Sequence, residues 1–361
     1  LYTALTFLVI SCPCALVLSV PLAFFSGIGA GSKQGILFKG GSSLEALKNI
    51  KAIIMDKTGT ITKGNFVLQH IICAPDAGLS EKELLFLAAS CESASTHPIA
   101  QSILDAAKAE SISVDKAGVI TEISGHGIQM QTDDGLVLCG NRKLLAEQGI
   151  DISSYTQNAE DAAAYGTEVL LARNGSYLGS LVIADTIKEE AAPAVRSLKK
   201  QKLTTIMLTG DAPKTAEEVA KQTGIDEIYA RLLPEEKLAR LKEIRERHGA
   251  VMFVGDGIND APVLAGADVG AAMGSGADAA IEAADVVFMT SSMEAIPASI
   301  KIAKAACRIA TQNVTFALVI KALFMILGLA GKASMWFAVF ADTGVAMLCI
   351  LNSIRILYQK R

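Results

Sequence analysis

The chain has 361 residues, 51% of them hydrophobic and 19% charged, and its 33 Lys and Arg against 37 Asp and Glu give a formal net charge of −4. So much apolar material excludes an intrinsically disordered chain, and a slightly acidic balance without a basic stripe excludes a nucleic-acid binder held by bulk electrostatics. The mean hydropathy of +0.39 is high for a soluble protein, and a few long apolar runs account for it. We therefore expect a membrane protein with a large soluble insert.

Three apolar segments, residues 1–30, 311–332 and 333–357, reach the roughly 20 residues that a helix needs to cross a bilayer. Basic residues follow the first segment, precede the second and follow the third, whereas Lys332 is the only charge in residues 331–334, where the second segment meets the third. The positive-inside rule then places the middle of the chain and its C-terminus in the cytoplasm. The sequence predicts a multi-pass protein of the cell membrane, with the lipid bilayer as a partner and cytoplasmic soluble domains.

The first apolar segment lacks the basic start of a secretory signal peptide and is too long for one. The chain opens inside this segment without an initiator Met. We therefore expect a C-terminal piece of a longer protein whose upstream part is missing.

In the soluble part, short apolar runs that end in glycine or aspartate alternate with amphipathic stretches of helical spacing. Buried parallel strands that alternate with helices are typical of a doubly wound α/β domain. The apolar runs are residues 52–55, 205–208, 251–254, 269–272 and 286–289, and the helical stretches are 212–223 and 235–248.

The stretch 65–184 breaks this rhythm and predicts a separate α+β domain inserted into the α/β domain. Its expected elements are helices at 81–91 and 99–109 and strand-like runs at 118–128 and 136–139. The α/β domain would then comprise residues 31–64 and 185–310.

Asp56 opens the sequence Asp-Lys-Thr-Gly-Thr at the end of the first of these strands, where open α/β sheets bind their ligands. A carboxylate there suits nucleophilic attack on a phosphoryl group. Asp211 and Asp256 follow two other strands. Asp56 and Asp256 can hold Mg²⁺ between them, and Lys237 can add a fixed positive charge. A single aspartate at a strand end is more often a helix cap, but three on one sheet make that alternative improbable.

Asp-Lys-Thr-Gly-Thr at 56–60, Thr-Gly-Asp at 209–211 and Gly-Asp-Gly-Ile-Asn-Asp-Ala-Pro at 255–262 resemble the phosphorylation domain of P-type ATPases, a branch of the haloacid-dehalogenase superfamily. The resemblance implies membrane α-helices plus cytoplasmic α/β structure: a haloacid-dehalogenase-like, doubly wound phosphorylation domain with an inserted α+β nucleotide-binding domain. It also implies that Asp56 becomes an aspartyl phosphate. The implied site residues are Asp56, Lys237, Thr209, Asp211, Asn259 and Asp260 for catalysis, and Asp56, Thr58 and Asp256 for Mg²⁺.

Thr58 is a departure from the related phosphatases, which carry an acid/base aspartate two positions after the nucleophile. Losing that group slows hydrolysis of the phosphorylated intermediate. A persistent intermediate suits a pump rather than a phosphatase.

His97 stands before a proline that suits the first turn of a helix, and the histidine alone could equally cap that helix or contact a ligand. Gly125 and Gly127 flank one residue and let the backbone approach a ligand. Together with Glu92 and Asn141 they resemble the ATP-binding set of heavy-metal P-type ATPases, which implies that His97 orients the nucleotide and that the glycines lie near its phosphates. The sequence has no Walker-type Gly-x-x-x-x-Gly-Lys-Ser/Thr, which excludes a P-loop ATPase.

Cys12 and Cys14 flank Pro13 in the middle of the first apolar segment. A proline there opens the helix backbone, and two thiolates are soft ligands for a thiophilic metal, although lone cysteines in membrane helices are usually small apolar residues. Cys-Pro-Cys directly before the phosphorylation domain resembles the heavy-metal transporting (type IB) P-type ATPases. Lys321 and Asp342 are ionisable at membrane depth, so Asp342 can bind a divalent ion and Lys321 can be its counter-ion when the site is empty.

Two thiolates and a carboxylate suit Zn²⁺, Cd²⁺ or Pb²⁺, whereas copper(I) prefers all-soft ligands. Lys321 and Asp342-Thr343-Gly344 resemble the zinc/cadmium/lead exporting subgroup. Copper pumps typically carry Tyr-Asn in the penultimate helix, where this chain has Gln312-Asn313. The resemblance also implies further N-terminal membrane helices and an actuator domain with Thr-Gly-Glu, and this sequence contains no Thr-Gly-Glu.

These features predict ATP-driven export of Zn²⁺, Cd²⁺ or Pb²⁺ through an aspartyl-phosphate intermediate, with ATP as substrate and Mg²⁺ as cofactor. One alternative is a copper(I)-exporting pump of the same family. Another is a membrane-anchored haloacid-dehalogenase-like phosphatase, which would hydrolyse small phosphate esters without a metal cargo. A third alternative is a regulatory nucleotide-binding subunit without catalysis, which would function without Asp56.

Overall fold

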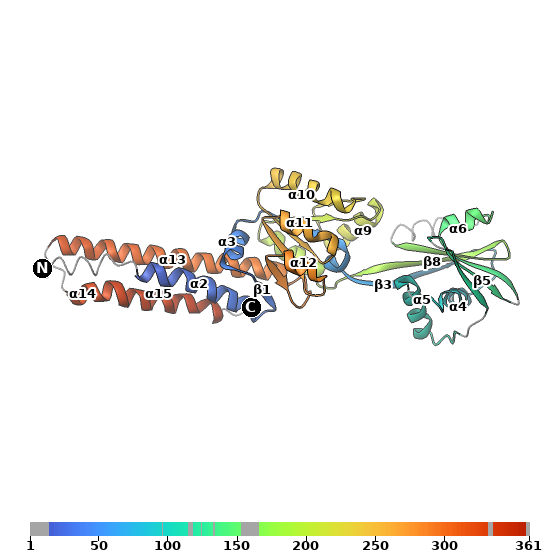
Figure 1. Ribbon diagram of the computed structural model, residues 1–361, viewed down its shortest axis with the longest axis horizontal. Helices are drawn as coiled ribbons and strands as arrows, with labels where there is room; N and C mark the ends of the chain where they lie inside the picture. The colour runs from blue at the N-terminus through green and yellow to red at the C-terminus, as the bar shows by residue number, and fades with distance from the viewer. Residues whose placement is uncertain are drawn as a thin grey trace. The chain divides into compact units, whose positions relative to one another are not determined.

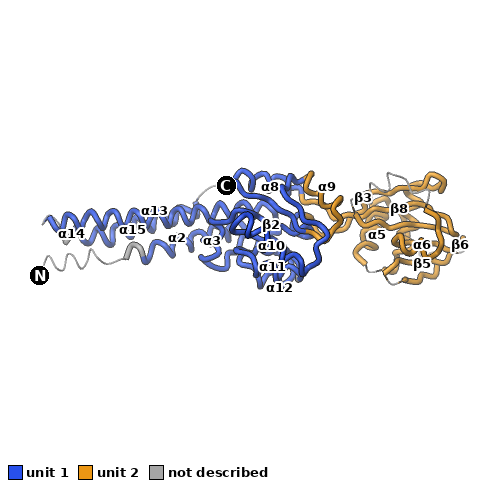
Figure 2. The backbone as a smooth tube through the Cα atoms, turned by 90° about the horizontal axis from the view of Figure 1, so that it is seen from above, with its two compact units in different colours: residues 1–61, 189–208, 223–361 blue, residues 62–188, 209–222 orange. Residues whose placement is uncertain are grey.

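The computed structural model describes residues 14–95, 97–114, 118–123, 125–132, 134–152, 166–330 and 335–358. The chain forms two compact units, coloured separately in Figure 2. The first unit comprises Leu1–Ile61, Glu189–Leu208 and Thr223–Arg361, and the second comprises Thr62–Lys188 and Thr209–Gln222.

The first unit contains a seven-stranded sheet with the strand order β1-β13-β12-β11-β2-β9-β10. Its strands are β1 (Ile36–Phe38), β2 (Ala52–Asp56), β9 (Thr204–Leu208), β10 (Glu227–Tyr229), β11 (Val251–Gly255), β12 (Val269–Met273) and β13 (Val286–Phe288). All pairs are parallel except β1 with β13. Every residue of β2, β11 and β12 is buried, as continuous apolar runs predict for parallel strands covered on both faces.

Helices cover this sheet, and the predicted doubly wound α/β architecture is confirmed (Figure 1). The helices are α3 (Gly41–Asn49), α8 (Ala191–Lys200), α10 (Pro234–His248), α11 (Ala261–Gly266) and α12 (Asp278–Ala283). Side chains of α10, α11 and α12, such as Leu241, Leu264 and Ala280, form one apolar core with the central strands. Strand β2 has β9 as its neighbour in one direction across the sheet and β11 as its neighbour in the other. The chain forms β9 and β10 first and then returns to form β11. The order therefore reverses between β2 and β11, where such sheets bind ligands.

The apolar helices of the first unit lie side by side, since α2 contacts both α13 and α15 (Figure 1). They are α2 (Cys14–Ser32), α13 (Ala295–Leu329), α14 (Met335–Val339), a π-helical turn η3 (Phe340–Gly344), α15 (Val345–Ile354) and a 3₁₀ turn η4 (Arg355–Tyr358). Ala295–Leu329 and Trp336–Tyr358 are long and apolar enough to cross a membrane, and the apolar stretch Val17–Ser32 of α2 is shorter.

One helix, α13, runs without a break from the soluble domain into the second apolar segment. Its 35 residues span about 52 Å, well beyond the roughly 30 Å of a bilayer core. Its first half is buried at Ile296, Ile300 and Ala303 and contacts α3 and α8. The predicted start of the segment at 311 therefore lies inside a continuous helix.

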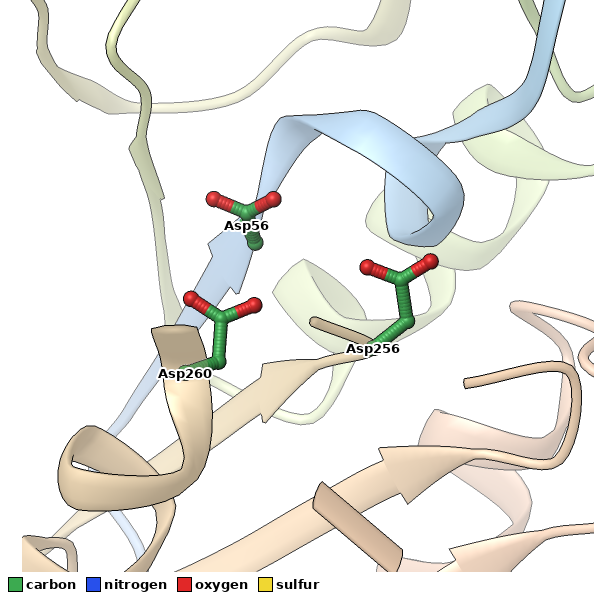
Figure 3. A group of neighbouring side chains, drawn as sticks. All are labelled: Asp56, Asp256 and Asp260. Atoms are coloured by element: carbon green, nitrogen blue, oxygen red, sulfur yellow. The ribbon is translucent and has the colours of Figure 1, made fainter. Parts of the chain in front are cut away.

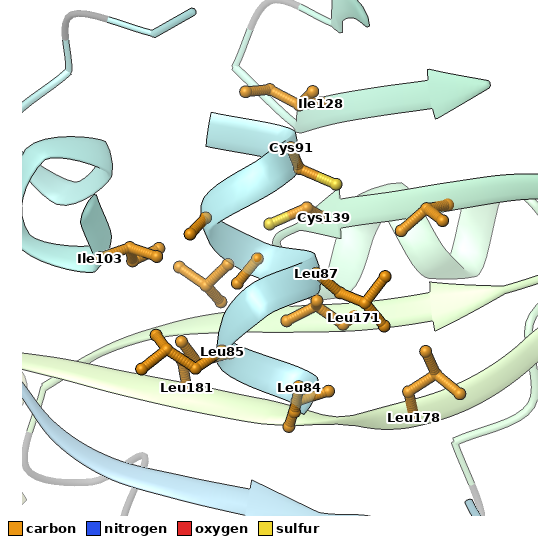
Figure 4. Close-up of a cluster of buried hydrophobic side chains, with 14 of the residues drawn as sticks. Leu84, Leu85, Leu87, Cys91, Ile103, Ile128, Cys139, Leu171, Leu178 and Leu181 are labelled. Carbon is orange, nitrogen blue, oxygen red and sulfur yellow. The ribbon is translucent and has the colours of Figure 1, made fainter. Parts of the chain in front are cut away.

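The second unit contains a six-stranded antiparallel sheet with the order β3-β8-β7-β6-β5-β4. Its elements are β3 (Thr62–Cys73), α4 (Glu81–Glu92), α5 (Pro98–Ala109), β4 (Val119–Ile123), β5 (Gly127–Thr132), β6 (Gly135–Gly140), α6 (Arg142–Glu147), β7 (Thr167–Arg173), β8 (Ser176–Ile187) and most of α9 (Pro213–Thr223). Helices α4 and α5 share an apolar core with the sheet, part of which Figure 4 shows, and α6 belongs to a second core.

The predicted α+β character of this stretch is confirmed, with one correction. The run 118–128, expected as one strand-like segment, forms β4 and β5 joined by a turn, because Gly125 adopts a positive φ of 72° that reverses the chain. The bounds predicted for the inserted domain, 65 and 184, lie inside β3 and β8, and they stay a prediction.

Candidate functional site

Three carboxylates converge in the first unit at the point where the strand order of the sheet reverses, between β2 and β11. Asp56 is the last residue of β2, Asp256 is the first residue after β11, and Asp260 ends the loop that follows β11 (Figure 3). One carboxylate oxygen from each lies within 4.8 Å of the others. Parallel neighbours β2 and β11 end at the same sheet edge, and this brings together residues 200 positions apart in the sequence.

Lys237 neutralises part of this charge from the first turn of α10. Its Nζ donates to Asp56 Oδ1 at 2.6 Å and to Asp260 Oδ1 at 2.8 Å. Asp260 Oδ2 accepts a hydrogen bond from the Gly257 N–H at 3.2 Å, which fixes the loop after β11. Asp56, Lys237 and Asp260 are all buried, so the lysine has a set position relative to the two carboxylates.

The electrostatics of this cluster favour an added cation. Burial and the neighbouring Asp260 charge raise the pKa of Asp56 to about 7, against the opposing effect of Lys237. Burial lowers the pKa of Lys237, but Asp56 and Asp260 outweigh it and raise that pKa, so the lysine stays an ammonium. One ammonium against three carboxylates leaves an excess of negative charge on oxygen ligands. This donor set fits Mg²⁺, which binds through one or two carboxylates together with phosphate oxygens.

The turn after Asp56 requires its glycine. Thr58 (φ −70°, ψ 132°) and Gly59 (φ 70°, ψ −19°) have the dihedrals of a type II turn, whose third position favours glycine. A Cβ on Gly59 would lie 1.5 Å from Asp256 Oδ2, so the backbone is packed against the metal-ligand candidate. Thr60 is fully buried, and its Oγ1 has no hydrogen-bond partner among the described residues. A buried hydroxyl without a partner at this position fits a site that completes its contacts with a ligand.

Asn259, Thr209 and Asp211, the remaining predicted catalytic residues, are not among the three converging carboxylates or their lysine partner. Asn259 is exposed between the two aspartates of its loop. Thr209 and Asp211 follow β9 and belong to the second unit, where Thr209 Oγ1 accepts from the Asp211 N–H at 3.1 Å. The roles of all three stay predictions.

The five predicted nucleotide contacts share one cavity in the second unit. A cavity of about 340 Å³ is lined by Glu92, His97, Gly125, Gly127 and Asn141. Gly125 has a positive φ and no atom within 4 Å of a built Cβ, so its backbone is open to a ligand. The Gly127 Cβ would lie 2.3 Å from the Cys139 carbonyl oxygen, so this glycine is needed for the close approach of β5 to β6.

His97 and Asn141 both cap helices beside this cavity. His97 Nδ1 accepts from the Ile99 N–H at 3.2 Å, which leaves the exposed Nε2 as the protonated ring nitrogen and a donor for a ligand. Asn141 Oδ1 accepts from the Leu144 N–H at 3.1 Å, and its Nδ2 donates to the Gly125 carbonyl at 3.0 Å. Asn141 therefore holds the glycine turn in place.

Glu92 lies at the buried end of the cavity. Burial raises the pKa of its carboxyl, and Cys139 Sγ donates to its Oε1 at 3.9 Å. Sequence reasoning missed Glu122, His126 and Thr167, which also line the cavity. The position of His126 between two glycines was a usable signal, whereas Glu122 and Thr167 belong to no motif.

The predicted transported-ion residues are described only in part. Cys12 lies outside the described residues, and of Cys14 only the backbone at the start of α2 is described. Lys321 Nζ and Asp342 Oδ1 lie 3.9 Å apart between α13 and η3, and both side chains are largely buried. Neither of these two atoms has a hydrogen-bond partner within the described part of the chain. Asp342 lies in a π-helical turn, a distortion that is frequent at functional sites.

Comparison with known proteins gives consistent matches along the whole chain. The family model of haloacid dehalogenase-like hydrolases matches residues 50–268. A zinc-transporting ATPase of Synechocystis sp. is 49% identical over 359 residues, covering 98% of this chain and 48% of that protein. A cadmium, zinc and cobalt-transporting ATPase of Bacillus subtilis is 48% identical, covering 99% of this chain and 50% of that protein. The chain thus spans about half the length of the curated relatives it matches.

Solved structures agree with these relatives. A zinc-transporting PIB-type ATPase in its E2.Pi state superposes with a TM-score of 0.91 at 37% identity, covering 99% of this chain and 58% of that one. The catalytic domain of a CPx-ATPase superposes with a TM-score of 0.61 at 28% identity, covering 76% of this chain and 98% of that one. The resemblance inferred from the sequence motifs is confirmed by these comparisons.

Proposed function

Since the chain belongs to the haloacid dehalogenase-like hydrolase family, we propose that it carries the phosphorylation machinery of an ATP-driven pump that exports Zn²⁺, Cd²⁺ or Pb²⁺ across the cell membrane. The observation that carries this proposal is the buried Asp56, bound to Lys237 at the sheet's switch point, in the same unit as the apolar helices. The names of the matched zinc- and cadmium-transporting ATPases support the class of cargo.

Asp56 is the nucleophile of this proposal. Lys237 holds Oδ1, so Oδ2 is the oxygen that attacks the γ-phosphorus of ATP. A bond forms between Oδ2 and phosphorus while the bond from phosphorus to the β,γ-bridging oxygen breaks, and ADP leaves with that electron pair. The product is an aspartyl phosphate, and the fixed ammonium of Lys237 stabilises the charge on the transferring group.

Asp56 and Asp256, with Thr58, would hold Mg²⁺ beside the nucleophile. When bound, the ion supplies positive charge that allows one anion to attack another. Gly59 carries no Cβ, so the backbone can approach Asp256 closely without a side chain that would collide with the metal-ligand carboxylate. Asp260 does not need to bind the ion, because its role is to orient Lys237.

The nucleotide would occupy the cavity around His97. The Nε2–H of His97 is a donor for the nucleotide, and the open backbone at Gly125 lets phosphate oxygens approach. Asn141 positions this turn through its bond to the Gly125 carbonyl. Thr209, Asp211 and Asn259 keep the catalytic roles that the sequence motifs imply for them.

Lys321 and Asp342 support a divalent cargo. Lys321 Nζ and Asp342 Oδ1 are close, and neither atom has a hydrogen-bond partner among the described residues, so charge holds the pair together in a buried setting. A divalent cation that binds Asp342 replaces the Lys321 ammonium as its counter-charge. Cys12 and Cys14 would add thiolates on the first apolar helix, and the soluble domains would face the cytoplasm.

ATP hydrolysis by the full chain in proteoliposomes tests this proposal, with Zn²⁺, Cd²⁺, Pb²⁺ and Cu⁺ added separately. We expect stimulation by the three divalent ions and its loss in Asp342→Asn. Stimulation by Cu⁺ alone would favour the copper pump. Rapid metal-independent hydrolysis of p-nitrophenyl phosphate would favour the phosphatase.

A further inference from the structure

A second cavity of about 710 Å³ lies in the first unit, along α13 where this helix leaves the soluble domain. Lys48 of α3 and Lys304 and Arg308 of α13 line it. Figure 1 shows both helices, which contact each other directly. Neither the proposed phosphorylation site nor the nucleotide cavity shares a residue with it.

No acidic residue in the described part of the chain neutralises the positive charge of this cavity. Lys48, Lys304 and Arg308 form no ion pair and no side-chain hydrogen bond with any residue in the described ranges. Glu45, one turn before Lys48, is exposed and likewise forms no ion pair there. Three cations that line one cavity without an acidic partner among the described residues create a positive potential that attracts an anion.

The same cavity becomes apolar further along α13. Thr311 and Thr315 follow the cations, and Phe316 and Val319 line its far end with 41% and 59% of their surface exposed. Arg308 and Val319 are eleven residues apart, or about 16 Å along the helix axis. A ligand that fills this length has an anionic head and a hydrocarbon tail.

We propose that this cavity binds an anionic phospholipid, with its phosphate at Lys48, Lys304 and Arg308 and an acyl chain along Phe316 and Val319. Basic pockets beside transmembrane helices on the cytoplasmic side are suited to such head groups. The proposal rests on the membrane insertion of α13 in the proposed function, but not on the transported metal. Because the cations belong to both α3 and α13, a bound lipid links these helices, and α3 leads directly into β2 and Asp56.

Native mass spectrometry of the full chain in detergent tests this site by titration with phosphatidylglycerol and with phosphatidylcholine. We expect tighter binding of phosphatidylglycerol than of phosphatidylcholine. In a separate thermal unfolding measurement, the midpoint should rise with the concentration of phosphatidylglycerol. At about 1 kcal/mol per cation near an anionic head group, Lys304→Gln/Arg308→Gln should weaken phosphatidylglycerol binding about 30-fold. Lys301→Gln is the matched control, because Lys301 is an exposed cation of the same helix that lines a different cavity.

Equal binding of the two lipids, or an equal loss in Lys301→Gln, would overturn the proposal. A competition experiment with inorganic phosphate tests whether the site binds a soluble anion. Displacement of phosphatidylglycerol by millimolar phosphate would assign the site to a soluble anion instead of a lipid. Lys304→Arg/Arg308→Lys should restore lipid binding, which separates lost charge from misfolding. Phosphorylation of Asp56 in the same variants reports on the proposed function independently.

Discussion

At the scale of single residues, Lys237 sets the charge balance of the proposed phosphorylation site. Its ammonium contacts Asp56 and Asp260, and both carboxylates would otherwise repel each other in a buried setting. Lys237→Met should raise the pKa of Asp56 further and slow phosphoenzyme formation by at least about 100-fold. The initial rate of ³²P incorporation from ATP measures this effect.

The control for this change is Lys242→Met, since Lys242 is an exposed lysine of the same helix. It should leave the rate unchanged. An equal rate in Lys237→Met would show that the ammonium is not part of the reaction.

Two features prevent a side chain at position 59: the positive φ of Gly59 and the close contact that a Cβ would make with Asp256. An alanine in this left-handed conformation costs about 1–2 kcal/mol by itself. Gly78 has a similar φ of 61° and open space around its Cβ, so Gly78→Ala isolates this backbone cost. We expect Gly59→Ala to lower the thermal unfolding midpoint more than Gly78→Ala and to abolish phosphorylation. Similar midpoints with retained phosphorylation would contradict the close packing of the turn.

The motif residues show how far sequence reasoning reaches at this scale. Asp56 and Asp256 could be paired because strand ends of one parallel sheet share an edge. The double contact of Lys237 with Asp56 and Asp260 could not be predicted from the sequence, because it depends on how α10 packs over the strands. The cap made by His97 was one of two open alternatives, and its Nδ1 bond is compatible with a ligand contact through Nε2.

At the scale of elements, Asp226, which directly precedes the edge strand β10, joins α8 to β9. Its Oδ2 accepts from the N–H and Oγ1 of Thr205 at 2.9 and 2.7 Å, and Lys199 Nζ lies 2.6 Å from Oδ1. Burial would raise the pKa of Asp226, but Lys199 and the Thr205 bonds outweigh it and lower that pKa. This contribution to stability is therefore complete above the unfolded-state pKa of about 3.9 and is lost as the pH falls through the lower folded-state pKa.

Asp226→Asn should lower the free energy of unfolding by about 2 kcal/mol at pH 7 and flatten its decline below pH 4. Thermal unfolding midpoints from pH 3 to pH 8 measure this profile. Asp105→Asn, an exposed aspartate of α5, is the control and should keep the wild-type profile. A wild-type acid decline in Asp226→Asn would contradict the account.

Asn313 links the apolar helices. Its Nδ2 donates to the Cys349 carbonyl at 3.1 Å and to Ser353 Oγ at 2.9 Å, while Asn352 Nδ2 donates to its Oδ1 at 2.8 Å. Sequence reasoning treated Asn313 only as a marker of metal selectivity, because the partners on α15 follow from helix packing. Ser353 Oγ in turn donates to the Ser19 carbonyl of α2 at 3.3 Å, so three helices share the network.

Asn313→Ala should lower the stability of the helix bundle by about 1 kcal/mol, the range of interhelical hydrogen bonds in membranes. The thermal unfolding midpoint in detergent measures this loss. Leu318→Ala on the exposed face of the same helix should change the midpoint less. The opposite order would show that the network adds no stability.

At the scale of the whole molecule, the hydrophobic pattern predicted the central parallel strands of the seven-stranded sheet, which are continuous apolar runs, but in the six-stranded sheet it indicated only β4, β5 and β6. The pattern missed β1 and β10, which are short edge strands, whereas the equally short β13 was predicted because all three of its residues are apolar and buried. It also missed β7, β8 and β3, and β3 is largely exposed along its length. It also ended the soluble domain at 310, whereas α13 continues through this point because its first half packs against α3 and α8. Composition changes at the membrane boundary, but the helix does not.

The central claim is that Asp56 receives the γ-phosphoryl group of ATP in response to a soft divalent metal. Acid-stable phosphoenzyme formation from [γ-³²P]ATP by the full chain tests it most directly, with Zn²⁺, Cd²⁺ and Cu⁺ compared and Asp56→Asn as control. We predict label on Asp56 with Zn²⁺ or Cd²⁺ and none in Asp56→Asn. Label that persists in Asp56→Asn, or that forms with no metal dependence, would contradict the account.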